Sequence, residues 1–259
     1  MSLNRLYARV HEVNSLLCIG LDPAHTSTFS DLISFNRRII DVTHPYTAAY
    51  KLNTAFYEAE GSSGWRALEY TTAYLREAYP SIFIIADAKR SDIAHTSERY
   101  MRAFFDRLGV DAVTLNPLMG HDALAPFLER EDKVSIILGR TSNPGAADFF
   151  DMMTDGHPLW QRIVEKVATE WDARRNCMLV IGATEPQHIA QARAIAPYVP
   201  FLIPGVGAQG GDLVASVQAG ITADGRGPLI NVGRGILSHS APAAAALRYQ
   251  MAINEALQR

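Results

Sequence analysis

The stretch Ile82-Phe83-Ile84-Ile85-Ala86-Asp87-Ala88-Lys89-Arg90-Ser91-Asp92 decides how the rest of the chain is interpreted. Its first six residues predict a β-strand. The run is apolar throughout instead of alternating, which is typical of a parallel strand that is buried on both faces. A polar turn follows, and residues 92–108 then have the spacing of a helix. The stretch is therefore one strand followed by one helix.

The same strand-then-helix unit recurs eight times, with no linker rich in Pro, Gly or Ser between units. This α/β pattern favours a single closed (β/α)8 barrel, a TIM barrel, with residues 1–259 as one domain, and an open doubly wound sheet is the alternative. A further helix is expected near the N-terminus. The predicted strands are 16–21, 48–52, 82–87, 112–116, 134–139, 178–181, 201–204 and 229–232. The predicted helices are 29–42, 65–79, 92–108, 122–130, 159–174, 187–195, 212–219 and 242–258.

Composition fits such a barrel and disfavours several classes of protein. The 259 residues are 48% apolar, and 24 Lys and Arg against 27 Asp and Glu give a net charge of −3. No basic stripe suggests nucleic-acid binding. No apolar run approaches the roughly 18 to 20 residues that span a bilayer, and the N-terminus lacks a signal-peptide core, so a cytoplasmic protein is expected. Cys18 and Cys177 lie in apolar strand-like runs, which suits buried free thiols.

Lysine is rare in this chain, since only four of the 24 basic residues are lysines. Lys51 and Lys89 stand at the ends of adjacent predicted strands, on the face where barrels place their active sites. Asp87 and Lys89, two apart, should point to the same side of an extended backbone. One interpretation is an alternating array of Lys and Asp that keeps the lysines protonated for proton donation and charge stabilisation. The other is an ordinary rim ion pair, with Lys51 at the surface and Asp92 as a helix N-cap.

Glycine-rich loops follow the last two predicted strands. Gly205-Val206-Gly207-Ala208-Gln209-Gly210 has the spacing of a dinucleotide fingerprint, but it follows the seventh strand instead of the first and lacks the expected acidic partner. Gly233-Arg234-Gly235 follows the eighth strand. Barrels bind phosphate at these two loops, so the pattern predicts a phosphorylated substrate. The alternative is that the glycines serve only tight turns.

Residues 140–155 form a long connection that begins with polar residues and continues with apolar ones. Ser142 and Asn143 could contact a heterocycle while Phe149, Phe150 and the methionines after them exclude water as a lid. Equally, the apolar residues could pack on the outer helices. The eight histidines show no metal-ligand spacing, so no metal site is predicted. They are interpreted as structural or surface residues, with His95 and His121 as the open cases.

Taken together, these motifs resemble those of the orotidine 5'-phosphate decarboxylases. Thr141-Ser142-Asn143-Pro144-Gly145 is further similar to the longer bacterial subgroup of that family. One departure is Ser97, where the family usually has an apolar or amide residue, and it touches no inferred contact. The residues that carry the resemblance are Asp22, Lys51-x-Asn53, Asp87-x-Lys89-x-x-Asp92-Ile93-x-x-Thr96, Pro204-Gly205-Val206-Gly207-Ala208-Gln209-Gly210-Gly211 and Asn231-Val232-Gly233-Arg234-Gly235.

The resemblance implies conversion of orotidine 5'-monophosphate to uridine 5'-monophosphate and CO2 in pyrimidine biosynthesis, without metal or cofactor. Lys89 would stabilise and protonate the C6 carbanion, and Asp87 would crowd the departing carboxylate and hold Lys89. Asp92 and Thr96 would reach into the partner's site in a homodimer. The remaining implied roles are ribose binding by Lys51 and Asp22, pyrimidine contact by Ser142, a bridge from base to phosphate by Gln209, and phosphate binding by Gly233, Arg234 and Gly235. Asn53 matches the motif without an assigned role.

Two other functions stay open at this point. A related barrel that binds Mg2+ could decarboxylate or condense sugar phosphates, although such enzymes should carry a carboxylate at the second strand, where this chain has Lys51. A non-catalytic barrel that binds a phosphorylated ligand is the second alternative. Such a binder would not need Asp87 and Asp92 beside an anionic ligand.

Overall fold

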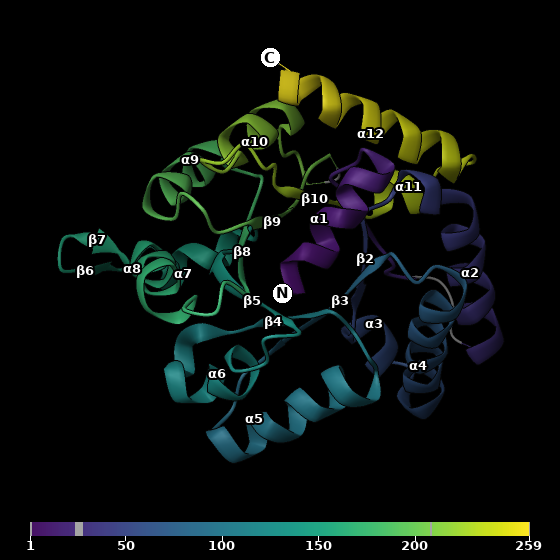
Figure 1. Ribbon diagram of the computed structural model, residues 1–259, viewed down its shortest axis with the longest axis horizontal. Helices are drawn as coiled ribbons and strands as arrows, with labels where there is room; N and C mark the ends of the chain where they lie inside the picture. Colours follow the sequence, from purple (N-terminus) through teal and green to yellow (C-terminus); the bar gives the residue numbers. More distant parts are fainter. Residues whose placement is uncertain (1, 24–27, 208, 259) are drawn as a thin grey trace.

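The structure, a computed structural model, describes residues 2–23, 28–207 and 209–258. Its centre is a closed barrel of parallel strands, surrounded by helices (Figure 1). The predicted (β/α)8 barrel is therefore confirmed and the open sheet is wrong, because β1 pairs with both β2 and β10. The strands, in their order around the barrel, are β1 (Leu17–Gly20), β10 (Leu229–Val232), β9 (Phe201–Pro204), β8 (Cys177–Ile181), β5 (Val134–Arg140), β4 (Ala112–Leu115), β3 (Phe83–Arg90) and β2 (Ala49–Asn53).

Helices follow the strands nearly as predicted, and the N-terminal helix is present. Two predicted helices continue as π-helical turns, at Arg102–Arg107 and Val167–Trp171. Three short helices and the hairpin of β6 (Met153–Thr154) and β7 (His157–Pro158) lie in loops where none was predicted. The α-helices are α1 (Ser2–Val13), α2 (Phe29–Thr43), α3 (Ala55–Glu58), α4 (Gly61–Ala78), α5 (Ala94–Met101), α6 (His121–Leu128), α7 (Ala147–Phe150), α8 (Leu159–Lys166), α9 (Pro186–Ile195), α10 (Leu213–Gly220), α11 (Arg234–Leu237) and α12 (Pro242–Gln258).

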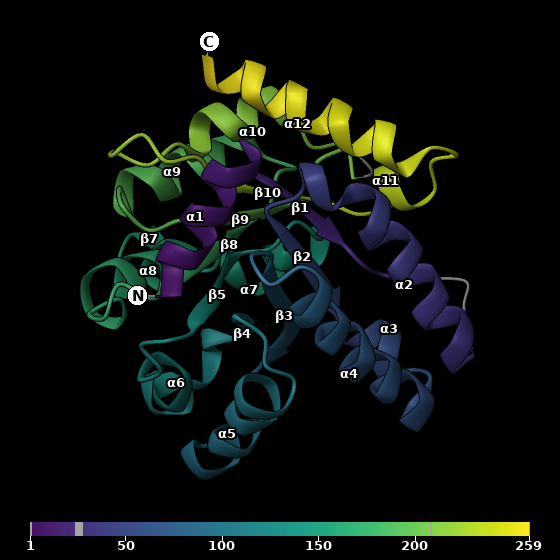
Figure 2. The same cartoon turned by 45° about the vertical axis from the view of Figure 1, so that its right-hand side comes forward.

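The barrel strands are buried on both faces, as their continuous apolar sequences indicated. Alternate residues form two cores, one inside the barrel and one between the barrel and its helices. Leu3 and Leu6 of α1 join the inner core, and Arg5 pairs with Asp111 at 3.2 Å. Helix α1 therefore lies across one end of the barrel, as the rotated view also shows (Figure 2). The opposite end is left open for a site.

The inward positions change character along the strands. Near α1 they are apolar, as with Phe83 of β3 and Val134 of β5. Toward the carboxyl ends of β2, β3 and β4 they become Lys51, Asp87 and Thr114, all of which are buried. Charged side chains are costly to bury unless they are paired, so this polar layer marks the functional end of the barrel.

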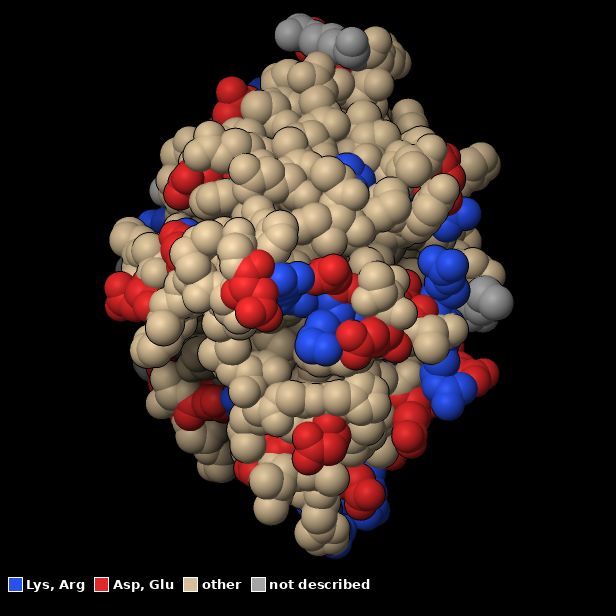
Figure 3. All heavy atoms as spheres, turned by 90° about the vertical axis from the view of Figure 1, so that its left-hand side faces the viewer, with Lys and Arg blue, Asp and Glu red and all other residues tan. Residues whose placement is uncertain are grey.

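Outside the barrel, basic and acidic side chains are mixed. On the face drawn in Figure 3, blue and red atoms alternate instead of forming a patch of one sign. Helix α8 and the π-helical turn that continues it carry two ion pairs on their surface, Arg162 with Glu165 at 2.9 Å and Lys166 with Glu170 at 3.0 Å. Such pairs stabilise a helix only modestly. No helix within the described part of the chain is long and apolar enough to cross a membrane.

Candidate active site

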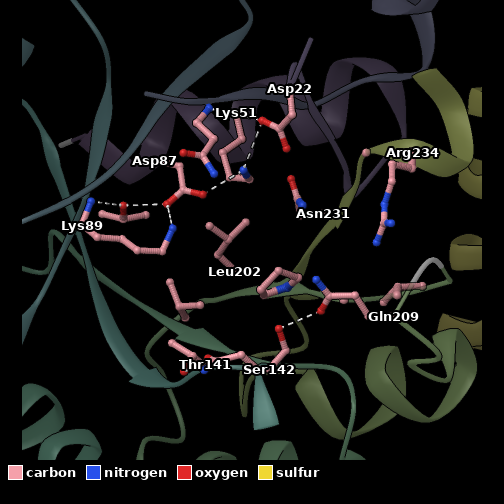
Figure 4. Close-up of a pocket in the computed structure, with 18 of the residues that line it drawn as sticks. Asp22, Lys51, Asp87, Lys89, Thr141, Ser142, Leu202, Gln209, Asn231 and Arg234 are labelled. Carbon is pink, nitrogen blue, oxygen red and sulfur yellow. Dashed lines mark hydrogen bonds and ion pairs between the residues drawn. The ribbon is translucent and has the colours of Figure 1, made fainter. Parts of the chain in front are cut away.

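A cavity of about 590 Å³ opens at the carboxyl end of the barrel (Figure 4). Charged side chains lie at one side of it, Arg234 lies across from them, and apolar side chains form the wall between. The residues that line it are Asp22, Lys51, Asn53, Phe56, Asp87, Lys89, Thr114, Leu138, Thr141, Ser142, Asn143, Val180, Leu202, Pro204, Gly205, Val206, Gln209, Asn231, Gly233, Arg234 and Leu237.

Four charged side chains form an alternating array, in which the expected Lys51, Asp87 and Lys89 are joined by Asp22 and not by Asp92. Lys51 Nζ lies 2.9 Å from Asp87 Oδ2 and 4.0 Å from Asp22 Oδ1. Lys89 Nζ lies 2.6 Å from Asp87 Oδ1. The alternative of a surface Lys51 is wrong, since its side chain is only 5% exposed. The array places Asp87 between two ammonium groups.

Asp87 stays ionised because of its neighbours. Burial acts to raise the pKa of its carboxyl, but the ammonium groups of Lys51 and Lys89 outweigh burial and hold that pKa well below its ordinary value. Thr114 Oγ1 donates a further hydrogen bond to Asp87 Oδ1 at 2.9 Å. In turn, burial acts to lower the pKa of Lys51, while Asp87 and Asp22 raise it above the ordinary value. Both members of this pair are therefore charged at neutral pH.

The backbone conformation that brings Lys89 to the cavity differs from the one expected from the sequence. Strand β3 is irregular between Ala86, which pairs with Val113, and Arg90, which pairs with Leu115. Lys89 has a φ of +49°, in the left-handed region that L-residues rarely adopt. The extended backbone assumed for Asp87 and Lys89 is thus wrong, although their side chains do meet. The Lys89 side chain is 46% exposed, so its ammonium group is accessible from the cavity.

Asp22 and Asn53 extend the polar side of the cavity. Asp22 Oδ1 accepts a hydrogen bond from the Asn53 backbone N–H at 3.3 Å, and Asn53 Oδ1 accepts one from the N–H of Ala55 at 3.2 Å. The Asn53 side chain thus binds the backbone of the first residue of α3, Ala55, which gives Asn53 a structural task beside its place in the lining. Asp22 retains its second carboxylate oxygen near the cavity (Figure 4).

The loop after β9 passes close to the loop after β5. Ser142 Oγ donates to Gln209 Oε1 at 2.8 Å, which joins the two loops at the edge of the cavity. Gly205, with a φ of +97°, permits this approach, because a Cβ there would lie 2.9 Å from the same Gln209 oxygen. Gly205 therefore allows both the turn and the close approach of the Gln209 side chain. Ala208 of this motif lies outside the described residues.

Of the glycines beside Arg234, Gly233 lines the cavity and Gly235 does not. A Cβ at Gly235 would lie 2.5 Å from the hydroxyl of Tyr249 in α12. Gly235 therefore allows the short helix α11 to pack against α12. Its predicted phosphate contact is not supported by the cavity lining.

The connection 140–155 begins beside the cavity and then leaves it. Arg140 is buried and contacts both carboxylate oxygens of Asp151 at 3.0 Å, which holds the base of the loop. Phe149 is 64% exposed and Met153 is 67% exposed, whereas Phe150 packs against the outer core. The apolar part thus only partly packs on the helices, and none of it lines the cavity.

Asp92 and Thr96 do not line the cavity of their own chain. Asp92 is not the helix N-cap, because Ile93 holds that position and Asp92 Oδ1 accepts from the Ile93 N–H at 2.7 Å. Ser97 does touch this segment, contrary to expectation. Its buried hydroxyl donates to the Asp92 carbonyl at 2.9 Å and accepts from the Asp92 N–H at 3.2 Å. Ser97 therefore fixes the backbone that carries Asp92.

The two doubtful histidines also lie outside the cavity lining. His95 is exposed, 3.8 Å from Glu98, and the ring of His121 lies 6.2 Å from that of Trp171. Within residues 2–23, 28–207 and 209–258, no three His, Cys, Asp or Glu side chains gather as a metal would require. The ammonium group of Lys51 itself occupies the space between the Asp22 and Asp87 carboxylates.

Sequence reasoning missed Thr114 and the apolar wall, and it assigned no role to Asn231 although this residue begins one of the motifs. Thr114 and Asn231 are the single polar residues of their short strands, and both point inward near the open end. A polar residue in a strand buried on both faces is a usable signal. Leu138, Val180 and Leu202 carry no such signal, because apolar strand residues are expected in any barrel.

Comparison with known proteins agrees with this geometry. Residues 15–249 match the model of the Orotidine 5'-phosphate decarboxylase / HUMPS family. An orotidine 5'-phosphate decarboxylase of Cellvibrio japonicus is 46% identical over 234 residues, 86% of this chain and 85% of the relative. One of Janthinobacterium is 45% identical, covering 91% and 89%.

Solved structures give the same result. The OMP decarboxylase of Leishmania donovani has a TM-score of 0.92 and 38% identity, covering 100% of this chain and 99% of its own. The UMP synthase of the same organism has a TM-score of 0.94 and 41% identity, covering 98% of this chain but 56% of the larger protein. The chain belongs to the Orotidine 5'-phosphate decarboxylase / HUMPS family.

Proposed function

We propose that this protein converts orotidine 5'-monophosphate to uridine 5'-monophosphate and CO2 in pyrimidine biosynthesis. The observation that carries the proposal is Asp87 held between Lys51 and Lys89, at 2.9 and 2.6 Å, beside the cavity. It combines a fixed negative charge with an accessible proton donor. The names of the relatives support the same activity.

The charges suit the electron flow of this decarboxylation. When the bond between C6 and the carboxylate breaks, its electron pair stays on C6 as a carbanion with no adjacent carbonyl to accept it. Lys89, as the accessible ammonium group, stabilises that charge and then donates a proton to C6. Asp87 is ionised, so it repels the substrate carboxylate and not the neutral CO2 that leaves. Lys51 holds Asp87 in place.

The rest of the cavity suits a nucleotide of this size. Leu138, Val180 and Leu202 offer an apolar wall to a flat ring, and the Ser142–Gln209 pair offers polar groups at its edge. Arg234, across the cavity from the lysines, provides charge for a phosphate. Binding energy from the remote phosphate can then hold the reacting ring against the charge array.

The magnesium-dependent alternative is disfavoured by Lys51. A metal that binds both Asp22 and Asp87 would compete with an ammonium group already 4.0 and 2.9 Å from their oxygens. The cation that an enediolate mechanism needs is replaced here by an amino acid. A non-catalytic binder is disfavoured by Asp87, because a buried carboxylate beside an anionic ligand would weaken its binding.

The decisive experiment follows the absorbance of orotidine 5'-monophosphate after mixing with enzyme that has been treated with EDTA. We expect turnover, and we expect Lys89→Ala to lower kcat by at least about a thousandfold while the protein stays folded. Lys166→Ala, on the outer surface of α8, is the matched control. Absence of turnover in the wild type, or near-normal turnover by Lys89→Ala, refutes the proposal.

We also propose that two chains form a homodimer in which Asp92 and Thr96 complete the partner's site. The support is their position outside their own cavity, beside Ile93, whose side chain is 63% exposed. Mixing inactive Lys89→Ala and Asp92→Ala variants tests the idea. Random exchange of subunits should restore about a quarter of the activity, because half of the dimers are mixed and each mixed dimer has one intact site. No recovery, with exchange verified, contradicts it.

We infer that the protein is located in a reducing compartment, the cytoplasm. Cys18 and Cys177 are both buried and free in the structure, as expected from the sequence. Buried free thiols are usual in compartments where cysteine side chains are kept reduced. Fractionation of the cells that express the protein tests the location directly.

A further inference from the structure

Asn231 is a cavity-lining residue to which neither the motifs nor the proposed chemistry assigns a task. It lies in β10, in register with Cys18 of β1 on one side and Pro204 of β9 on the other. Its side chain points into the cavity between Asp22 and Arg234 (Figure 4). It therefore stands midway between the charge array and the phosphate end.

The thiol of Cys18 determines which way the amide of Asn231 is turned. Cys18 is fully buried, and burial raises the pKa of its thiol to about 12, so the sulfur carries its proton at neutral pH. Sγ lies 3.6 Å from Asn231 Oδ1. The S–H group donates to the amide oxygen, whereas an N–H in that place would meet only the weak acceptor capacity of sulfur, so this orientation is the better pairing. The Nδ2 donor is consequently the atom left for the cavity.

Gly20 makes room for this arrangement. A Cβ at Gly20 would lie 3.2 Å from Asp22 Oδ2 and 3.5 Å from Asn231 Oδ1, so both polar side chains border the same small gap. The carboxylate of Asp22 accepts hydrogen bonds and the amide nitrogen of Asn231 donates them. Side by side, they complement an alcohol group, which has one donor and two acceptor sites.

We propose that Asn231, oriented by the Cys18 thiol, donates a hydrogen bond from Nδ2 to a sugar oxygen of the bound nucleotide. This inference rests on the proposed function, because in a nucleotide the sugar joins the base to the phosphate. Asn231 is thereby a substrate-binding residue, and Cys18 is a positioning residue that acts through it. No bond of the sugar changes in the reaction, so the interaction acts equally on ground state and transition state.

Variants at both positions test the inference through the separate effects on KM and kcat. Asn231→Leu, which keeps the size and removes the donor, should raise KM about tenfold, equivalent to about 1.4 kcal/mol, with kcat within about twofold. Cys18→Ala should raise KM about threefold, and Cys18→Ser should restore it, because a hydroxyl also donates to Oδ1. In an Asn231→Leu background, Cys18→Ala should have no further effect on KM.

Controls separate this inference from folding and from the proposed function. Cys177→Ala removes another buried thiol, one that donates to the Trp171 carbonyl away from the cavity, and should leave KM unchanged. Calorimetric binding of uridine 5'-monophosphate gives an affinity that does not depend on turnover. An inactive wild type refutes the proposed function alone. An active wild type with unchanged KM and product affinity in Asn231→Leu, or equal effects of Cys18→Ala and Cys18→Ser, overturns the inference.

Discussion

Replacing Lys51 by methionine is the sharpest test of the charge array. Methionine has a similar length and no charge, so Asp87 keeps only Lys89 and Thr114 as partners, and Asp22 loses its ammonium neighbour. The Lys51 side chain is 5% exposed and that of Asp87 is 11% exposed, so water cannot replace the lost cation easily. The variant should therefore reveal the energy of a buried ion pair.

The magnitude follows from the distances. At an effective dielectric constant near 20, charges 2.9 Å apart attract by about 6 kcal/mol, and charges 4.0 Å apart by about 4 kcal/mol. The cost of removing these groups from water offsets much of that attraction, so breaking one partner of a buried pair costs about 3 to 5 kcal/mol. Because Lys89 still neutralises Asp87, we expect Lys51→Met to lower the free energy of unfolding by about 3 kcal/mol.

Urea unfolding at neutral pH measures this effect, with Lys166→Met as the control. Lys166 pairs with Glu170 on the exposed surface of α8, and its loss should change stability by less than about 0.5 kcal/mol. Adding Asp87→Asn to Lys51→Met should recover part of the stability and none of the activity, because the buried carboxylate that lost one of its two ammonium partners is gone. If Lys51→Met unfolds at the same urea concentration as Lys166→Met, the reasoning is refuted.

Three further outcomes are expected. Arg234→Ala should lower kcat/KM for the phosphorylated substrate by about 10- to 100-fold, as a lost charge-assisted contact predicts. Gly235→Ala should lower the unfolding free energy by about 1 to 3 kcal/mol because its Cβ meets the Tyr249 hydroxyl, and Tyr249→Phe should relieve most of that loss in a thermal melt. The folded pKa of Asp87 lies below its unfolded value of about 3.9, so its stabilisation is present above about pH 4 and is lost as the pH falls further, by up to about 1.4 kcal/mol per pH unit. Urea titrations at several acidic pH values should show this decline in the wild type and less of it in Asp87→Asn.

Each of these outcomes has a contrary result that would count against it. An unchanged kcat/KM in Arg234→Ala would show that Arg234 does not bind the phosphate. Failure of Tyr249→Phe to restore the Gly235→Ala variant would mean that the strain lies elsewhere. Identical acid dependence in the wild type and Asp87→Asn would mean that another carboxyl group dominates the acid side.

The sequence predicts those features of the fold and site whose physical cause lies within a few neighbouring residues. Continuous apolar runs such as 178–181 predict buried parallel strands, and eight strands separated by helices predict a barrel. Lys51 and Lys89 were identifiable because a lysine at the end of a buried strand is costly unless it has a partner. Their pairing with Asp87 follows, since the ends of successive strands are neighbours in a barrel, whereas the presence of Asp22 in place of Asp92 does not.

Other features depend on contacts between distant parts of the chain. Between Ala86 and Arg90, β3 has more residues than the facing part of β4, and Lys89 adopts its left-handed backbone there. No local sequence pattern shows this irregularity. Gly235 has its close neighbour in α12, fourteen positions further along, so it resembled a phosphate-loop glycine. Asn231 and Cys18 are 213 positions apart and meet only because the barrel closes between β10 and β1.

The sequence alone determined that this protein is a barrel with a phosphate-binding pattern and a rare pair of lysines among carboxylates, because strand burial and charge placement are written residue by residue. Only the tertiary structure decided which of those polar residues share a cavity, which serve packing, and that Cys18 and Asn231 lie in contact. The physical reason is that hydrogen bonds and ion pairs act over a few ångströms of space, and closure of the barrel sets those distances independently of separation along the chain.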